Sequence, residues 1–160
     1  MTVLALAIGR AELAAAPVAA GVGPADIRRI ALPAEAKWDA CRDLLLEVAG
    51  DDEITAVGIA CPGGIPSVSG EFSLRHTGFG IVAAVRRMFP VAIVQVATRE
   101  LCRALAERNL GPVPGADAIL AGAGVLALIA EERVPRTSHR DTRGPTRRPR
   151  RATCLRPRRR

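Results

Sequence analysis

Histidine is scarce in this sequence, and its cysteines lack the spacing of a metal site. The chain has two histidines and four widely separated cysteines, Cys41, Cys61, Cys102 and Cys154. No two cysteines form a C-x-x-C pair, and His76 and His139 are not near them in sequence. Because structural zinc needs four such ligands, usually in closely spaced pairs, we expect no metal site. Three cysteines lie in apolar runs, which is typical of reduced core residues in a cytoplasmic protein.

The sequence also lacks a hydrophobic run long enough to cross a bilayer. Residues 118–130 are uncharged but number only thirteen, whereas a membrane helix needs about 17 to 25. The opening run Val3–Ile8 has no basic residue before it and is soon followed by Arg10 and Glu12, unlike a signal peptide. We therefore expect no membrane span, no membrane partner and a cytoplasmic location.

Lysine is almost absent, because Lys37 stands alone against 22 arginines. Twelve of those arginines lie from Arg133 onward, where Asp141 is the only acid. The remaining 11 basic and 15 acidic side chains make the preceding part mildly acidic, although the whole chain carries a net charge of +7. The basic character of this protein therefore belongs to its C-terminal tail.

The tail, residues 135–160, combines dense arginine and proline with no apolar periodicity. Such a composition cannot bury enough surface to order itself, so the tail is predicted to be disordered. It can bind polyanions nonspecifically through their phosphates, but it has no interleaved aromatics for base stacking. The abrupt change of composition also fits a frameshifted or truncated reading of a GC-rich gene, and both interpretations stay open.

The part before the tail is as long as one ordinary domain and rich enough in hydrophobic residues to build a core. Apolar β-branched runs predict five strands, at Val3–Ile8, Glu12–Ala19, Asp26–Leu32, Ile54–Cys61 and Val91–Val96. Three- and four-residue periodicity predicts three helices, at Glu35–Ala49, Phe79–Phe89 and Arg99–Asn109. The order β-β-β-α-β-α-β-α predicts an α/β fold, a mixed sheet with helices packed on it.

Several residues mark the ends and the inner faces of these helices. The apolar stripe from Trp38 to Val48 predicts a core-facing side for the first helix. Gly50 stands where a glycine would end that helix, and Thr98 is placed to cap the start of the third. In the third helix, Leu101, Cys102 and Leu105 are predicted to face inward.

A charge-free strand followed by a Pro-Gly-Gly turn stands at the centre of the sequence. Ile54–Cys61 reads as a strand covered on both faces. Pro62 then removes a ladder donor, and Gly63 and Gly64 allow a backbone to approach a ligand closely. Ligands of open α/β sheets gather at the carboxyl ends of strands, so these three residues are candidates for a substrate loop. The alternative is a turn that only ends the strand.

Two motifs carry a resemblance to a known family. They are Gly58-Ile-Ala-Cys-Pro62-Gly63 at the end of the central strand and Ala104-Leu-Ala-Glu107 in the third helix. Together with the element order, they resemble the ROK family of bacterial repressors and sugar kinases, over about residues 3–134. The resemblance implies the N-terminal lobe of the actin-like, ribonuclease-H-like ATPase fold at 1–115. It further implies a remnant of the second lobe at 116–134, before the disordered tail at 135–160.

This chain departs from the family at the residues that carry the chemistry. The family's Asp-Ile-Gly-Gly-Thr phosphate loop is Ala7-Ile-Gly-Arg-Ala11 here, so Gly9 is the remaining candidate for nucleotide binding. The family's catalytic aspartate is replaced by Arg99, which cannot accept a proton at neutral pH. Glu100 is adjacent, but one helical step rotates a side chain by roughly 100°, which makes it a poor substitute base.

The resemblance implies a sugar ligand, with ATP and Mg²⁺ as cofactors of the family. Because the phosphate loop, the aspartate and most of the second lobe are missing, we expect a catalytically inactive protein with no cofactor of its own. Two alternatives are a nucleic-acid-associated or repressor-related protein that uses the tail, and a residual ATP-dependent sugar kinase. The resemblance also makes 118–128 a strand and glycine turn without its own sheet. An apolar segment exposed in that way predicts self-association.

Overall fold

The computed structural model describes residues 1–18, 26–35, 37–62, 80–113, 115 and 117–133. Within them lies a five-stranded sheet of order β3-β2-β1-β4-β5. Its strands are β1 (Thr2–Ile8), β2 (Glu12–Val18), β3 (Arg28–Ala31), β4 (Ile54–Cys61) and β5 (Ile93–Thr98). The first three strands pair antiparallel, whereas β1, β4 and β5 run parallel to one another. The predicted mixed sheet is confirmed.

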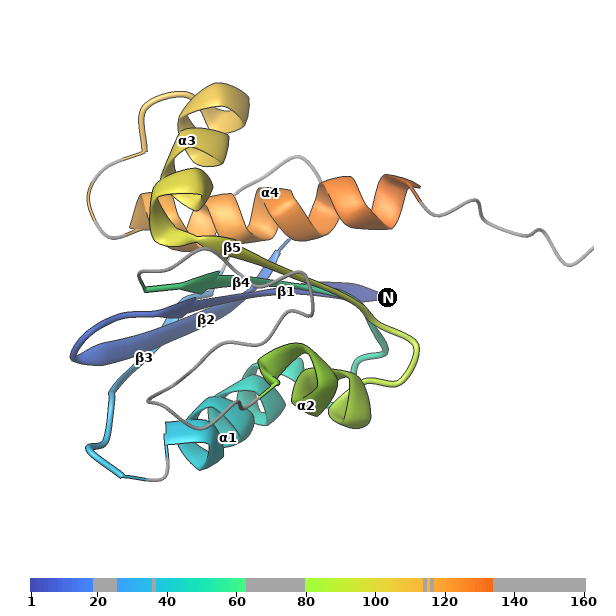
Figure 1. Cartoon of the computed structure of the whole chain (residues 1–160). Helices are drawn as coiled ribbons and strands as arrows, with labels where there is room; N and C mark the ends of the chain where they lie inside the picture. The colour runs from blue at the N-terminus through green and yellow to red at the C-terminus, as the bar shows by residue number, and fades with distance from the viewer. Residues whose placement is uncertain (19–25, 36, 63–79, 114, 116, 134–160) are drawn as a thin grey trace, which may run out of the picture.

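Helices cover both faces of this sheet (Figure 1). On one face lie α1 (Lys37–Ala49) and α2 (Ile81–Met88), and on the other lie α3 (Arg99–Leu110) and α4 (Asp117–Arg133). The five predicted strands and the three predicted helices are confirmed, with ends shifted by a few residues. Trp38 belongs to the core as expected, because it is half-buried against the cluster between the sheet and the α1 side.

The two faces of the sheet carry side chains of different size. Large side chains of the central strands point toward α1 and α2, among them Leu4, Leu6, Ile8, Val57 and Ile59. Small side chains point toward α4, among them Ala5, Ala14, Ala16, Ala56 and Ala60. Because alanine projects only a methyl group, a helix can lie close to this second face.

Two glycines set how closely α4 packs. A Cβ built on Gly58 of β4 would lie 1.8 Å from the carbonyl oxygen of Ala123 in α4. A Cβ built on Gly122 would lie 1.7 Å from the carbonyl oxygen of Cys102 in α3. No side chain fits at either contact, so glycine is required where α4 meets the sheet and where it meets α3.

The expected strand and glycine turn at 118–128 are wrong, because this segment belongs to the 17-residue helix α4. Its alanines and leucines are strong helix formers, and Asp117 and Arg133 complement the dipole at its two ends. The helix is buried along most of its length against the sheet and α3. The apolar patch from which self-association was expected is therefore not exposed. None of the described helices is long and apolar enough to span a membrane.

The ends of the helices follow the sequence signals, and one inward-facing residue does not. Gly50 has a φ of 54°, which only glycine adopts without strain, and it ends α1 as predicted. Thr98 caps α3, because its hydroxyl accepts a hydrogen bond from the Leu101 amide at 3.2 Å. The Leu101 side chain, however, is 51% exposed rather than inward-facing. The buried side of α3 is instead formed by Cys102 and Ala106, one turn apart.

Candidate functional site

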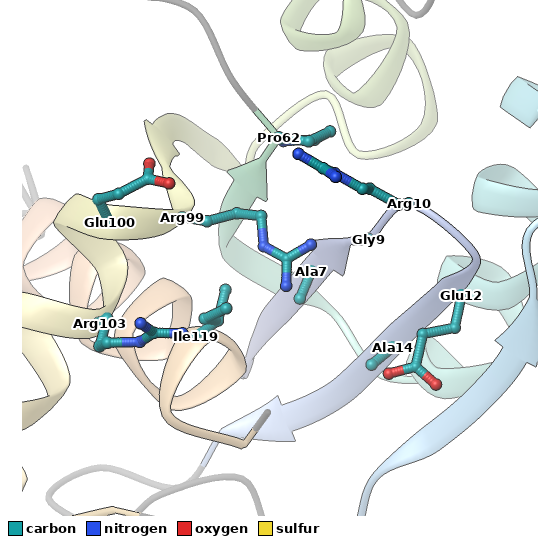
Figure 2. A pocket seen from close by; sticks show the side chains of 10 residues that line it. All are labelled: Ala7, Gly9, Arg10, Glu12, Ala14, Pro62, Arg99, Glu100, Arg103 and Ile119. Atoms are coloured by element: carbon teal, nitrogen blue, oxygen red, sulfur yellow. The ribbon is translucent and has the colours of Figure 1, made fainter. Parts of the chain in front are cut away.

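A pocket of about 510 Å³ lies at the carboxyl ends of β1 and β4, beside the start of α3 (Figure 2). It is lined by Ala7, Gly9, Arg10, Glu12, Ala14, Pro62, Arg99, Glu100, Arg103 and Ile119. Four residues selected from the sequence thus come together here, namely Gly9, Pro62, Arg99 and Glu100. The other two substrate-loop candidates, Gly63 and Gly64, lie outside the described residues, as does His76.

The tight turn between β1 and β2 forms one wall of the pocket. The Gly9 amide donates a hydrogen bond to the Glu12 carbonyl at 2.8 Å, and this bond closes the turn. A Cβ built on Gly9 would lie 2.8 Å from the same carbonyl oxygen and 3.5 Å from Nη1 of Arg99. Gly9 therefore leaves space for the turn to close and for the Arg99 guanidinium to lie over it.

The opposite wall is the first turn of α3. Its first residue is Arg99, whose side chain points toward Ala7 and Gly9 (Figure 2). Glu100, the next residue, lies on the other side of Arg99 from Ala7 and Gly9, and the step of about 100° per helical residue gives its side chain a different direction from that of Arg99. Arg103 lies four residues after Arg99, hence on the same side of the helix, and its side chain lies beside Ile119.

The pocket carries a net positive charge. Arg10, Arg99 and Arg103 point into it or line its rim, and no residue in the described part of the chain forms a salt bridge or hydrogen bond with them. The Glu12 carboxylate is already engaged by Arg29, 3.3 Å away on β3. Arg29 also pairs with Asp117 at the start of α4. The acidic charge on the β2 side is thus largely satisfied, whereas the three arginines are not.

Sequence reasoning missed two of these arginines. Arg10 directly follows Gly9, and Arg103 follows Arg99 at helical i,i+4 spacing. Both signals were present in the sequence. They indicate a site only once the β1–β2 turn and α3 are known to share a sheet edge.

A second cavity of about 470 Å³ adjoins the first through shared lining residues. Both cavities are lined by Arg99, Arg103 and Ile119, and the second is completed by Glu107, Val113, Gly115 and Ala118. The two guanidinium groups therefore lie between two hollows rather than at the end of one. A ligand with an anionic group and a larger body has room on either side.

The pocket offers neither a reactive thiol nor a metal centre. Cys61 ends β4 close to the pocket, but its side chain is buried. Burial raises its pKa to about 12, and the neighbouring Cys41 and Cys102 add to this shift. The thiol therefore stays protonated near neutral pH. All three described cysteines are free and buried, which confirms core positions for them, whereas Cys154 lies outside the described residues.

The charge of the pocket does not fit the Mg²⁺ that the family resemblance implies, because three arginines line it beside the carboxylates of Glu12 and Glu100. Mg²⁺ is held by carboxylate oxygens and water. The residues that the structure describes contain no group of three or more histidine, cysteine, aspartate or glutamate side chains that could hold a metal ion. Three guanidinium groups in the same space repel a divalent cation.

The fold can be compared with solved structures. A ROK hexokinase from Thermus thermophilus superposes with a TM-score of 0.60 at 20% identity, over 70% of this chain and 38% of the hexokinase. A ROK family glucokinase from Streptomyces griseus, solved with glucose and AMPPNP, superposes with a TM-score of 0.59 at 20% identity. The match covers 72% of this chain and 38% of the glucokinase. The fold is that of the ROK N-terminal lobe. A ROK family transcriptional regulator, a homologue of the E. coli MLC protein, superposes with a TM-score of 0.52 at 19% identity. The match covers 67% of this chain and 30% of the regulator.

These likenesses concern the fold of one lobe. The chain spans less than two fifths of the length of each of the two ROK kinases. No family model matches the sequence, and no curated protein matches it. The expected fold is therefore confirmed by structure alone.

Proposed function

We propose that this chain is a ROK-like lobe that binds a ligand without transferring a phosphoryl group. The observation that carries the proposal is the guanidinium of Arg99, which lies over Gly9. The resemblance implies that Arg99 replaces the family's catalytic base. By resemblance, a sugar hydroxyl would be deprotonated here. A guanidinium stays protonated throughout the physiological range, so it binds negative charge rather than accepting a proton.

The remaining carboxylates of the pocket do not replace the missing base. Glu12 is held by Arg29, and its side chain stands across the pocket from α3. Glu100 lies farther from Gly9 than Arg99 does, on the other side of the Arg99 side chain. General-base catalysis requires the acceptor within hydrogen-bond reach of the proton it removes. A sugar that entered the pocket would therefore find hydrogen-bonding partners but no positioned base.

Two further features support binding without turnover. Phosphoryl transfer relies on positioned phosphates and a neutralising metal, and the described residues offer neither the family's phosphate-loop side chains nor a metal site. The ROK glucokinase that shares this fold was solved with glucose and AMPPNP, which supports a sugar-related ligand for this lobe. A reducing cytoplasm is the proposed setting, because it suits three free buried cysteines.

The test is a coupled assay that follows ADP release from ATP with glucose, mannose or N-acetylmannosamine as the acceptor. The expected result is no sugar-dependent turnover above a control without protein, since loss of a general base alone costs roughly 10² to 10⁴ in rate. Sugar-dependent turnover that Glu100→Gln abolishes would show that Glu100 acts as a displaced base, and the proposal would then be wrong.

A second candidate function is supported by the composition of the tail. Twelve arginines lie from Arg133 to the end of the sequence, and they would attract nucleic acid through its phosphates. If binding to duplex DNA is purely electrostatic, the logarithm of the affinity falls with the logarithm of the salt concentration, with a slope of about −0.9 per neutralised phosphate. Such binding shows no preference between sequences. A repressor-like role would instead show a site preferred by at least roughly 10³ over random DNA. Filter binding of the full chain and of a variant lacking 135–160 separates these outcomes.

A further inference from the structure

The three pocket arginines form an arrangement that costs stability in the empty protein. Arg99 and Arg103 stand one turn apart on α3, and like charges at this spacing destabilise a helix. Glu100 and Glu107 lie three residues before and four after Arg103, yet no salt bridge joins either of them to it. The repulsion within this first turn therefore has no acidic partner among the described residues.

Arg10 brings a third positive charge from a different part of the chain. It projects from the β1–β2 turn, and its guanidinium lies beside Pro62 across the pocket from α3 (Figure 2). The turn that carries Arg10 is closed by the hydrogen bond between the Gly9 amide and the Glu12 carbonyl, so the sheet fixes the position of the Arg10 backbone. Positive charges from two separate elements thus face one cavity. The cluster is therefore more than the solvated charged face of a single helix.

We propose that this pocket binds the phosphate of an already phosphorylated small molecule, held between Arg99, Arg103 and Arg10. Guanidinium groups bind phosphate oxygens through paired, charge-assisted hydrogen bonds, and a phosphate monoester carries close to two negative charges at neutral pH. The positive end of the α3 dipole lies at the same place and adds to the attraction. A bound dianion also removes the repulsion between Arg99 and Arg103.

The size and the rim of the pocket define the rest of the ligand. A cavity of about 510 Å³ is much larger than a free phosphate ion and falls in the range of small-molecule sites. Glu12 and Glu100 line opposite sides of its rim, and their carboxylates accept hydrogen bonds from hydroxyl groups. The ligand class is therefore a phosphate monoester of a polyhydroxylated molecule. This inference rests on the proposed function and deepens it, because it names the class of ligand that the pocket binds without transferring a phosphoryl group.

The test is isothermal titration calorimetry of the full chain with glucose 6-phosphate, glucose and inorganic phosphate as separate probes. Glucose 6-phosphate is expected to bind at least about tenfold more tightly than glucose, because hydrogen bonds to charged groups are the strong ones. Binding of inorganic phosphate as tight as that of glucose 6-phosphate would support the arginine site and assign it to the free ion. Equal affinity for glucose and glucose 6-phosphate would overturn the proposal.

Arginine variants distinguish the pocket from the arginine-rich tail. Arg99→Ala is expected to weaken glucose 6-phosphate binding at least about tenfold, and Arg99→Lys should retain part of it because it keeps the charge. The matched control is Arg108→Ala, an exposed arginine on the same helix that lines neither cavity. Its affinity should equal that of the unmodified chain. Equal losses in both alanine variants would assign binding to general charge and refute the site.

A further variant keeps the test decisive if Arg99→Ala fails to fold. Arg10→Ala changes an exposed turn residue, so its thermal melting should match that of the unmodified chain while its phosphate affinity falls. Unchanged affinity in a folded Arg10→Ala variant would contradict the three-arginine arrangement. ADP release in the coupled assay would refute the proposed absence of transfer independently, since phosphate affinity is measured by heat and not by turnover.

Discussion

Replacing Gly58 by alanine should destabilise the protein by separating α4 from the sheet. The new Cβ would lie 1.8 Å from the carbonyl oxygen of Ala123, 2.8 Å from its carbonyl carbon and 3.1 Å from the Ala127 Cβ. Carbon–oxygen contacts between packed elements ordinarily lie at about 3.3 to 3.6 Å, so the helix has to retreat by roughly 1.5 Å. Two of these three atoms belong to the backbone, so a rotamer change cannot relieve the clash.

The loss of folding free energy follows from the packing that is disturbed when α4 moves away from the sheet. The interface between α4 and the sheet is built mostly from small buried side chains, with Val3, Val18, Ile119 and Leu120 as larger buried members. Overpacking of a close-packed interior costs about 1 to 3 kcal/mol, and the backbone clash places Gly58→Ala at about 3 kcal/mol. With a urea m-value of about 2 kcal/mol/M, the unfolding midpoint should fall by about 1.5 M. Circular dichroism during urea titration measures this midpoint.

The matched control is Gly80→Ala. Gly80 precedes α2 with a φ of −76°, and a Cβ built there meets nothing closer than the Ala83 Cβ at 3.6 Å. Its free energy of unfolding should change by no more than about 0.5 kcal/mol. If Gly58→Ala left the midpoint within error of the unmodified chain while the m-value stayed constant, the close approach of α4 to β4 would be refuted.

Three further predictions concern stability. Thr98→Ala removes the cap of α3 and should cost about 1 kcal/mol in urea unfolding, whereas Thr98→Ser should cost much less. Thr55→Val removes the hydroxyl that donates to Glu131 Oε1 at 2.6 Å, which ties α4 to β4, and should cost about 1 kcal/mol; no loss would show that the bond adds nothing. Burial raises the pKa of all three described cysteines from 9.0 to about 12. Unfolded thiols ionise above about pH 9 while folded ones stay protonated, so stability should be constant below pH 9 and fall above it, by up to about 1.4 kcal/mol per pH unit for each thiol. The chain has no tyrosine and one lysine, so urea midpoints that stay constant to pH 10.5 would contradict this burial.

The sequence alone determined most of the architecture, because the signals for strands and for the first three helices are local. Alternating apolar residues, the capping Thr98 and the terminating Gly50 act within a few positions of each other, and each is found where its pattern predicts. The sequence also singled out Gly9, Pro62, Arg99 and Glu100, all of which line one pocket. Parallel strands bring such residues together, because their carboxyl ends meet at one edge of the sheet.

Only the tertiary structure decided the state of 118–128 and the charge of the pocket. An apolar run of alanine, glycine and leucine suits either a buried strand or a buried helix, and periodicity cannot separate the two when every side is covered. The outcome depends on Gly58 and the alanines of β1, β2 and β4, which leave room for a helix. Likewise, Arg10 and Arg103 are 93 positions apart, and they form one site because the sheet places the β1–β2 turn opposite α3. Contacts between residues so far apart in sequence are set by tertiary packing, and local sequence patterns do not predict them.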